Sequence, residues 1–130
     1  NMDQSNTVTV GYWSTKGLGA VCRMVVLYSG CTLKAKNYKL QPVLNENNLT
    51  YDGSEWHDKD KIELKKRNPL INLPYIEVNN STGDVILISQ SNACLSFLGR
   101  KFDMFGKNEV DVSKCEQLLL ETNPKITFLT

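Results

Sequence analysis

The sequence predicts an α/β fold built on a mixed four-stranded sheet, and the order of its strand and helix signals is the reason. A β-branched, alternating segment over residues 7–13 is followed by a helical segment over 17–29 and a second strand over 35–40. Two further strands, over 75–78 and 85–88, flank a turn that contains Gly83. A strand–helix–strand unit has parallel strands, whereas two strands joined by a tight turn are antiparallel. The sheet is therefore expected to contain both kinds of pairing.

The segments between the strands also carry local signals. The helix over 17–29 is dense in apolar residues, so we expect it to be well buried, and Gly30 follows it where a helix C-terminus belongs. The strand over 35–40 alternates lysines with other residues, which is typical of a sheet edge. Residues 41–54 are rich in Asn, Pro, Asp and Gly and predict a long loop, with a short charged helix over 58–66 after it.

The element order also sets the expected domain organisation. Residues 1–7 are polar and are expected to form a flexible tail, and 8–103 form one β-α-β, α, β-β-α unit, which is the thioredoxin-like arrangement. A helix over 90–102 closes this unit. Residues 104–130 are expected to be a linker and the truncated start of a second, helical domain. Pro124 should break or kink any helix there.

Composition narrows the classes of partner. The chain has 130 residues, 41% of them hydrophobic and 22% charged, which is ordinary for a globular domain. With 15 basic and 14 acidic side chains the net charge is +1, so neither a nucleic acid nor a membrane is expected as a partner. Four cysteines without a C-x-x-C pair, and a single histidine, do not form a zinc-site spacing, and no metal is expected. Buried free thiols would suit a reducing, cytoplasmic compartment.

Four short motifs lie in order at the boundaries of the predicted elements. They are Gly11-Tyr12-Trp13, Lys16-Gly17-Leu18, Asn72-Leu73-Pro74-Tyr75 and Gln90-Ser91-Asn92-Ala93. Together they resemble mu-class glutathione transferases over about residues 8–106. The resemblance implies that 8–103 form a glutathione-binding domain and that the enzyme conjugates glutathione to small hydrophobic electrophiles as a homodimer. That family has a second, all-helical domain, which is not evident in this chain, so the chain alone is expected to conjugate weakly or not at all.

Tyr12, at the end of the first strand, is the implied catalytic residue. By resemblance its hydroxyl donates a hydrogen bond to the sulfur of glutathione. A free thiol has a pKa of about 8.5 and is mostly protonated at neutral pH, and a hydrogen bond offered to the thiolate lowers that pKa. The thiolate is the nucleophile that attacks an electrophilic carbon. The alternative is a core tyrosine at a strand end.

The resemblance also implies a set of glutathione contacts, each with a structural alternative. The indole N–H of Trp13 would bind a carboxylate, and a cis Pro74 would turn the backbone of Leu73 toward the cysteinyl part. Gln90 and Ser91, at a helix N-terminus, would bind the γ-glutamyl group. The alternatives are core packing for Trp13, a trans proline, and Ser89 as the helix cap. The complete set of implied contacts is Trp13, Leu18, Trp56, Lys59, Lys61, Asn72, Leu73, Pro74, Gln90 and Ser91.

The glycine end of glutathione is where the sequence departs from the family. Trp56 is expected to contact this end, but Gly53 stands where a basic residue is expected. Asp60 occupies the place of a second basic residue and is flanked by Lys59 and Lys61. His57 is interpreted as a solvated loop residue. These departures leave open a non-catalytic, glutathione transferase-like binding or assembly module.

Two further expectations concern cysteine chemistry and assembly. A redox role for one cysteine is a third reading, although Cys22 lies inside the first helix without an obvious thiolate stabiliser. Thioredoxin-type disulfide exchange is not expected, because Ser14 follows Tyr12-Trp13 where such proteins carry cysteine. By resemblance, Leu70 is the apolar side chain that inserts into the second domain of a partner subunit. Without that domain we expect no stable homodimer of this chain.

Overall fold

The centre of the protein is a four-stranded mixed sheet. The computed structural model describes the backbone of residues 7–128 and the side chains of residues 7–122. The strands lie in the order β2 (Thr32–Tyr38), β1 (Thr7–Trp13), β5 (Tyr75–Asn79) and β6 (Val85–Ser89). β1 pairs in parallel with β2 and antiparallel with β5, and β5 pairs antiparallel with β6. The predicted mixed sheet and its thioredoxin-like order are confirmed.

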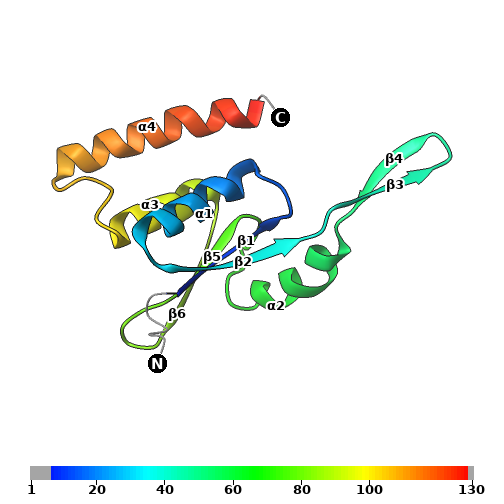
Figure 1. Cartoon of the computed structure of the whole chain (residues 1–130), viewed down its shortest axis with the longest axis horizontal. Coiled ribbons are helices and arrows are strands. Elements are labelled where there is room, and N and C mark those ends of the chain that lie inside the picture. The colour runs from blue at the N-terminus through cyan, green and yellow to red at the C-terminus, as the bar shows by residue number, and fades with distance from the viewer. Residues whose placement is uncertain (1–6, 129–130) are drawn as a thin grey trace.

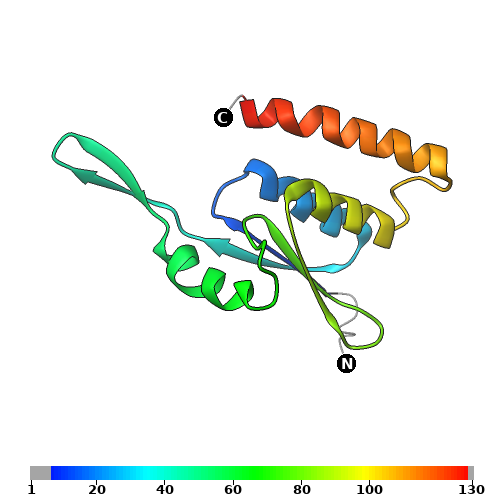
Figure 2. The same ribbon diagram turned by 180° about the vertical axis from the view of Figure 1, so that it is seen from behind.

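Two helices cover one face of this sheet. Figures 1 and 2 show α1 (Gly17–Ser29) and α3 (Ser91–Lys101) on one face and the short helix α2 on the other. The core between α1, α3 and the sheet consists of apolar and thiol side chains. These are Val8, Val10, Cys22, Val26, Ile76, Val78, Cys94 and Leu98.

The expectation that α1 is well buried is wrong for one of its faces. Met24 is 66% exposed, Leu27 61% and Tyr28 83%. Only Gly19, Cys22 and Val26 are buried, at the spacing that places residues on one side of a helix. The density of apolar residues therefore overstated how much of the helix faces the sheet. Gly30 ends the helix with a φ of 82°, as its position predicts.

An aromatic cluster lies under the opposite face of the sheet. A wide helical turn, η2 (Trp56–Asp60), continues into α2 (Lys61–Lys65), where a helix over 58–66 was predicted. Trp56 stacks on Tyr75 with ring centroids 5.7 Å apart and packs against Tyr38 at 5.0 Å. Ile71 completes the buried part of this cluster.

The predicted loop over 41–54 is a β-hairpin. β3 (Gln41–Asn45) and β4 (Asn48–Asp52) pair antiparallel, and the hairpin projects away from the sheet in both Figure 1 and Figure 2. All residues of both strands are exposed. The loop prediction was wrong because the asparagines and the proline are typical of loops. They made the strand-like alternation of side chains in this segment difficult to recognise. Pro42 lies opposite Tyr51 and Leu44 opposite Leu49 on one side of the ribbon.

The last helix, α4 (Glu109–Phe128), forms an outer layer beyond α1 and α3 and contacts α3. It continues through position 124, so the predicted break is absent. A proline removes one helical hydrogen bond, and the helical turns on both sides of position 124 continue without it. Of the expected tail over 1–7, Thr7 is already in β1, and the rest lies outside the described residues. No helix in residues 7–128 is both long and apolar enough to cross a bilayer.

Candidate functional site

Most of the predicted site residues meet at one end of the sheet. β1 ends at Trp13, and its Gly11 pairs with Tyr75, the first residue of β5. Tyr75 also pairs with Ser89, the last residue of β6. Because β5 runs antiparallel to both neighbours, the end of β1, the start of β5 and the end of β6 share one edge. The helices α1 and α3, which follow β1 and β6, begin at the same edge.

The ring of Tyr12 is seated on two glycines at the start of α1. A Cβ atom built on Gly19 would lie 2.4 Å from Tyr12 Cγ, and one on Gly17 would lie 2.7 Å from the Tyr12 hydroxyl oxygen. Gly17 also has a φ of 37°, where L side chains are strained. The half-buried ring therefore occupies space that only glycine leaves open, and its hydroxyl lies at the N-terminal turn of α1. Leu18, between the two glycines, is half-buried as well.

The segment before β5 presents its backbone at the same edge. The Leu73–Pro74 peptide bond is cis, as predicted. The Leu73 N–H donates to Asn72 Oδ1 at 3.0 Å. The Ser89 hydroxyl accepts from the Asn72 N–H and donates to its carbonyl oxygen, both at 2.9 Å. Ser89 therefore ties this segment to the end of β6 and is not the cap of α3.

Gln90 and Ser91 connect β6 to α3. The helix begins at Ser91, one residue later than predicted, and Gln90 precedes it with a φ of 77°. Positive φ is uncommon for a residue with a side chain and costs about 1–3 kcal/mol where the surroundings impose it. Neither α1 nor α3 has a side-chain cap or an acidic residue in its first turn. Both helix N-termini at this edge therefore favour an anionic group.

Trp13 and His57 enclose the backbone of Gly53. A Cβ atom on Gly53 would lie 2.9 Å from Trp13 Cη2 and 3.1 Å from His57 Cδ2. The two rings lie with centroids 5.7 Å apart and their planes tilted by 55°. A side chain at position 53 would have to displace one of the rings. This packing is a physical reason for the glycine at a position where the family resemblance implies a basic residue.

Asp60 faces the underside of the sheet. Its Oδ2 accepts from the Tyr38 hydroxyl at 2.7 Å and forms an ion pair with Lys36, and the Tyr38 and Tyr75 hydroxyls lie 2.7 Å apart. The hydrogen bond from Lys36 lowers the pKa of Asp60. Burial, followed by the hydrogen bonds to Tyr75 and Asp60, raises the pKa of Tyr38. The departure at position 60 thus serves the fold, while Lys59 is exposed and Lys61 half-buried.

Trp56 lies deeper than its predicted role suggests. It is 0% exposed, and its Nε1 is buried without a hydrogen-bond partner in the described part of the chain. His57, the next residue, is exposed and lies beside Trp13. The sequence interpretation missed this pairing, because position 57 follows a projecting hairpin whose course the sequence did not reveal.

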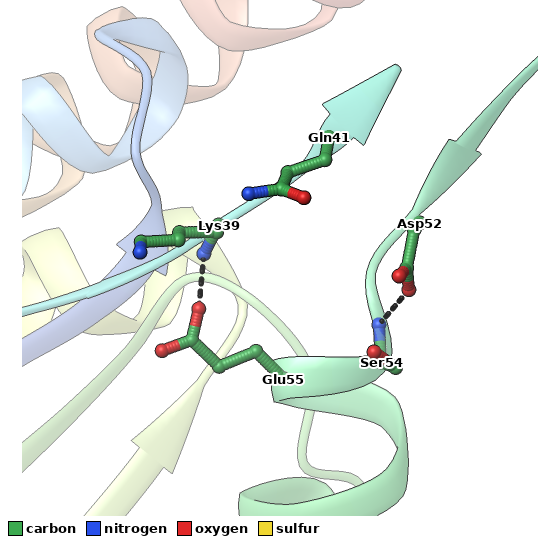
Figure 3. A pocket seen from close by; sticks show the side chains of 5 residues that line it. All are labelled: Lys39, Gln41, Asp52, Ser54 and Glu55. Atoms are coloured by element: carbon green, nitrogen blue, oxygen red, sulfur yellow. Dashed lines mark hydrogen bonds between the residues drawn. The ribbon is translucent and has the colours of Figure 1, made fainter. Parts of the chain in front are cut away.

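A separate small cavity lies at the base of the hairpin. Its volume is about 150 Å³, and Figure 3 shows the side chains that line it: Lys39, Gln41, Asp52, Ser54 and Glu55. Glu55 Oε2 accepts from the Lys39 N–H at 2.7 Å, and Asp52 Oδ1 accepts from the Ser54 N–H at 2.9 Å. The second bond lowers the pKa of Asp52. These bonds fasten the hairpin to the start of η2 and so fix where His57 emerges.

The fold and this edge define a thioredoxin-like α/β protein with a prepared anion-favouring end, and comparisons identify its relatives. No family model matches the sequence. It is 34% identical over 112 residues to glutathione S-transferase 2 of Gallus gallus, covering 85% of this chain and 44% of that protein. It is 32% identical over 126 residues to glutathione S-transferase Mu 6 of Mus musculus, covering 94% and 51%.

Solved structures agree on the fold. A glutathione S-transferase of C. elegans superposes with a TM-score of 0.60 at 20% identity, covering 86% of this chain and 44% of that chain. Na-GST-3 of the hookworm Necator americanus superposes with a TM-score of 0.63 at 17% identity, covering 93% and 48%. The chain is therefore related to the mu-class glutathione S-transferases, and it spans about half the length of the relatives that it matches.

Proposed function

We propose that this chain binds glutathione at the shared edge of β1, β5 and β6, and that the protein to which it belongs conjugates glutathione to hydrophobic electrophiles. One observation carries the proposal. The ring of Tyr12 rests on Gly17 and Gly19, so that its hydroxyl lies at the N-terminal turn of α1. A core tyrosine would not need two glycines to present its hydroxyl at a helix start.

Tyr12 is proposed to stabilise the thiolate. Its hydroxyl donates a hydrogen bond to the glutathione sulfur, and the positive end of the α1 dipole favours the same negative charge. Both interactions are stronger with the thiolate than with the thiol, so the pKa of the bound thiol falls. Leu18, in the first turn of α1, is proposed to pack against the cysteinyl part.

The backbone at Leu73 is proposed to bind the cysteinyl part as an added strand would. The Leu73 N–H now donates to Asn72 Oδ1 at 3.0 Å, so the Asn72 side chain has to turn for a ligand carbonyl to take its place. Asn72 then becomes free to contact the ligand itself. The turn breaks one exposed hydrogen bond and forms another, so its net cost is small.

The γ-glutamyl group is proposed to lie at the start of α3. Its carboxylate accepts hydrogen bonds from the first N–H groups of the helix and from the Ser91 hydroxyl. The carbonyl oxygen of the exposed Gln90 side chain can accept from the γ-glutamyl amine. The positive φ of Gln90 supports this role, because strained backbone concentrates at binding sites.

At the glycine end, Trp13 is proposed to donate its indole N–H to the glycyl carboxylate, with Lys59 or Lys61 adding positive charge. Trp56 supports this end from below, because it packs against Tyr38 and Tyr75 under the residues that face the ligand. A direct contact between Trp56 and glutathione remains a prediction. It requires the ligand to reach the unpartnered Nε1.

The wider assignment is also a proposal. α4 is proposed to begin a helical second domain after the unit over 8–103, and the protein to act as a cytoplasmic homodimer. Leu70 is 79% exposed, so its side chain is available to insert into a partner. All four cysteines are free, which fits a reducing compartment. Light scattering that shows a stable homodimer of the 130-residue chain would contradict the role given to Leu70.

Calorimetric titration of the chain with glutathione tests the central proposal. Thiolate absorbance of the bound ligand near neutral pH is followed in the wild type and in Tyr12→Phe. We expect binding by both and a thiolate signal in the wild type alone, because the variant keeps the ring and loses only the hydroxyl. Binding without any thiolate signal in the wild type would favour the non-catalytic module. No binding at all would refute a glutathione site in this chain.

A further inference from the structure

The exposed imidazole of His57 lies beside Trp13. We propose that His57 is a specificity-determining residue that recognises the glycyl carboxylate of glutathione together with Trp13. The inference rests on the proposed function. It replaces the expected basic residues at positions 53 and 60 with a histidine that reaches the same end of the ligand from a different position.

The packing around position 53 disfavours a basic side chain there. A Cβ atom there would lie 2.9 Å from Trp13 Cη2, closer than real Cβ atoms come, and 3.1 Å from His57 Cδ2, so that at least one ring would have to move. Both contacts are to rigid aromatic rings, so the conflict is not relieved by bending a flexible chain. Because position 53 is a glycine, the rings of His57 and Trp13 can both lie close to its backbone and to each other.

Position 60 cannot supply one either. The Asp60 carboxylate is held under the sheet by the Tyr38 hydroxyl, at 2.7 Å, and by the Lys36 ammonium. Its charge is therefore already paired with that of Lys36. Trp56 is 0% exposed, so the exposed group that η2 presents beside Trp13 is the imidazole of His57.

The position of His57 is fixed by its backbone. The N–H groups of Trp56 and His57 both donate to the Gly53 carbonyl oxygen at 3.0 Å, which closes the chain between the hairpin and η2. Trp56 anchors this turn in the aromatic cluster, and the imidazole rests against Trp13. Within the described residues, its side chain forms no hydrogen bond or ion pair. The ring nitrogens are thus available to a ligand without breaking an existing interaction.

The chemistry of the two rings suits one carboxylate. An indole donates one N–H, and an imidazole donates one N–H when neutral and two when protonated. The ring centroids are 5.7 Å apart. In the proposed complex each ring offers one donor to a different oxygen of the same carboxylate. Hydrogen bonds to a charged acceptor are the stronger class, and one such bond changes an affinity by about tenfold.

The test compares glutathione with γ-glutamylcysteine, which lacks the glycyl residue and its carboxylate. Calorimetry gives both dissociation constants for the wild type, His57→Ala and His57→Lys. We expect the wild type to prefer glutathione by about tenfold or more, and His57→Ala to lose about tenfold of that preference while γ-glutamylcysteine binds as before. His57→Lys should retain most of the preference, because lysine also offers an N–H donor to the carboxylate.

The control is Lys101→Ala, which removes an exposed cation from the opposite end of α3 and should leave both constants unchanged. An undiminished preference in His57→Ala overturns this inference and leaves the proposed function standing. Equal loss of affinity for both ligands also overturns it, because His57 would then act on the fold. Failure of the wild type to bind either ligand overturns the proposed function and this inference with it.

Discussion

Gly19→Ala should damage the site through the smallest side chain that can be added. A Cβ atom at position 19 would lie 2.4 Å from Tyr12 Cγ and Cδ1 and 2.5 Å from Tyr12 Cβ. Carbon atoms in contact are ordinarily about 3.5–4.0 Å apart. The close atoms are the root of the Tyr12 side chain rather than its far end, so a rotation of the ring alone does not relieve the overlap. Tyr12 must leave its position, or β1 and α1 must separate.

The expected magnitude follows from two opposing terms. Overpacking of a closely packed site costs about 1–3 kcal/mol. Alanine in place of glycine inside a helix returns about 0.5–1 kcal/mol. We therefore expect the free energy of unfolding to fall by about 1–2 kcal/mol, measured by urea denaturation with an unchanged slope. The thiolate absorbance of bound glutathione should disappear, because the hydroxyl of Tyr12 would leave the place from which we propose that it contacts the sulfur.

Gly99→Ala is the matched control. Gly99 is also a buried helical glycine against an aromatic ring, but a Cβ atom there meets only Phe105, at 2.9 Å from Cδ2. It lies near the far end of α3, away from the site. We expect a loss of stability with the thiolate signal intact. Unchanged or increased stability of Gly19→Ala, together with an intact thiolate signal, would refute the seating of Tyr12 on this glycine.

Two further predictions concern the interior. The hydrogen bond from Lys36 lowers the pKa of Asp60 below its ordinary value of 3.8, so its charged form stabilises the fold above that pH and the contribution is lost as pH falls through the lowered pKa. The urea midpoint of the wild type should therefore fall more steeply below about pH 4 than that of Asp60→Asn, and parallel acid profiles would contradict the pairing. Iodoacetamide, followed by mass spectrometry, should modify Cys31 and Cys115 in the native protein and spare Cys22 and Cys94, which are 0% exposed. Hydrogen bonding with Cys22 and burial also raise the pKa of Cys94, and rapid native modification of either buried thiol would show that the α1–α3 interface opens.

The parts of the fold that the sequence predicted are those in which local pattern and long-range packing agree. Val8 and Val10 alternate with polar residues in β1 and are both fully buried, and Ile76 and Val78 repeat the pattern in β5. The hairpin is the opposite case. Both of its strands are exposed throughout, so no core imposes a burial pattern, and its register depends on the two-residue turn after Asn45. Composition alone could not separate such a ribbon from a loop.

The residues of the candidate site likewise include some whose location the sequence predicts and some whose location it does not. Tyr12, Leu73 and Ser91 lie next to the ends of strands or helices. Once the strand order is known, these ends fall at one edge of the sheet, so the three residues are expected there. The sequence did not reveal positions that depend on the direction of a side chain. Nothing in the local sequence shows that Asp60 turns toward Tyr38, since that choice depends on a hydroxyl contributed 22 residues earlier.

The aromatic cluster explains the acidic residue at position 60. Tyr38 and Tyr75 bring two hydroxyls under the sheet, 2.7 Å apart, and a hydroxyl pair in a buried place needs a further acceptor. Asp60 is that acceptor, and Lys36 balances its charge. A lysine at position 60 could not accept the Tyr38 proton and would face Lys36, so a cation here and this cluster exclude each other. With the aromatic hydroxyls present, the exposed side of η2 is left to contact a carboxylate, and the proposed donor there is His57.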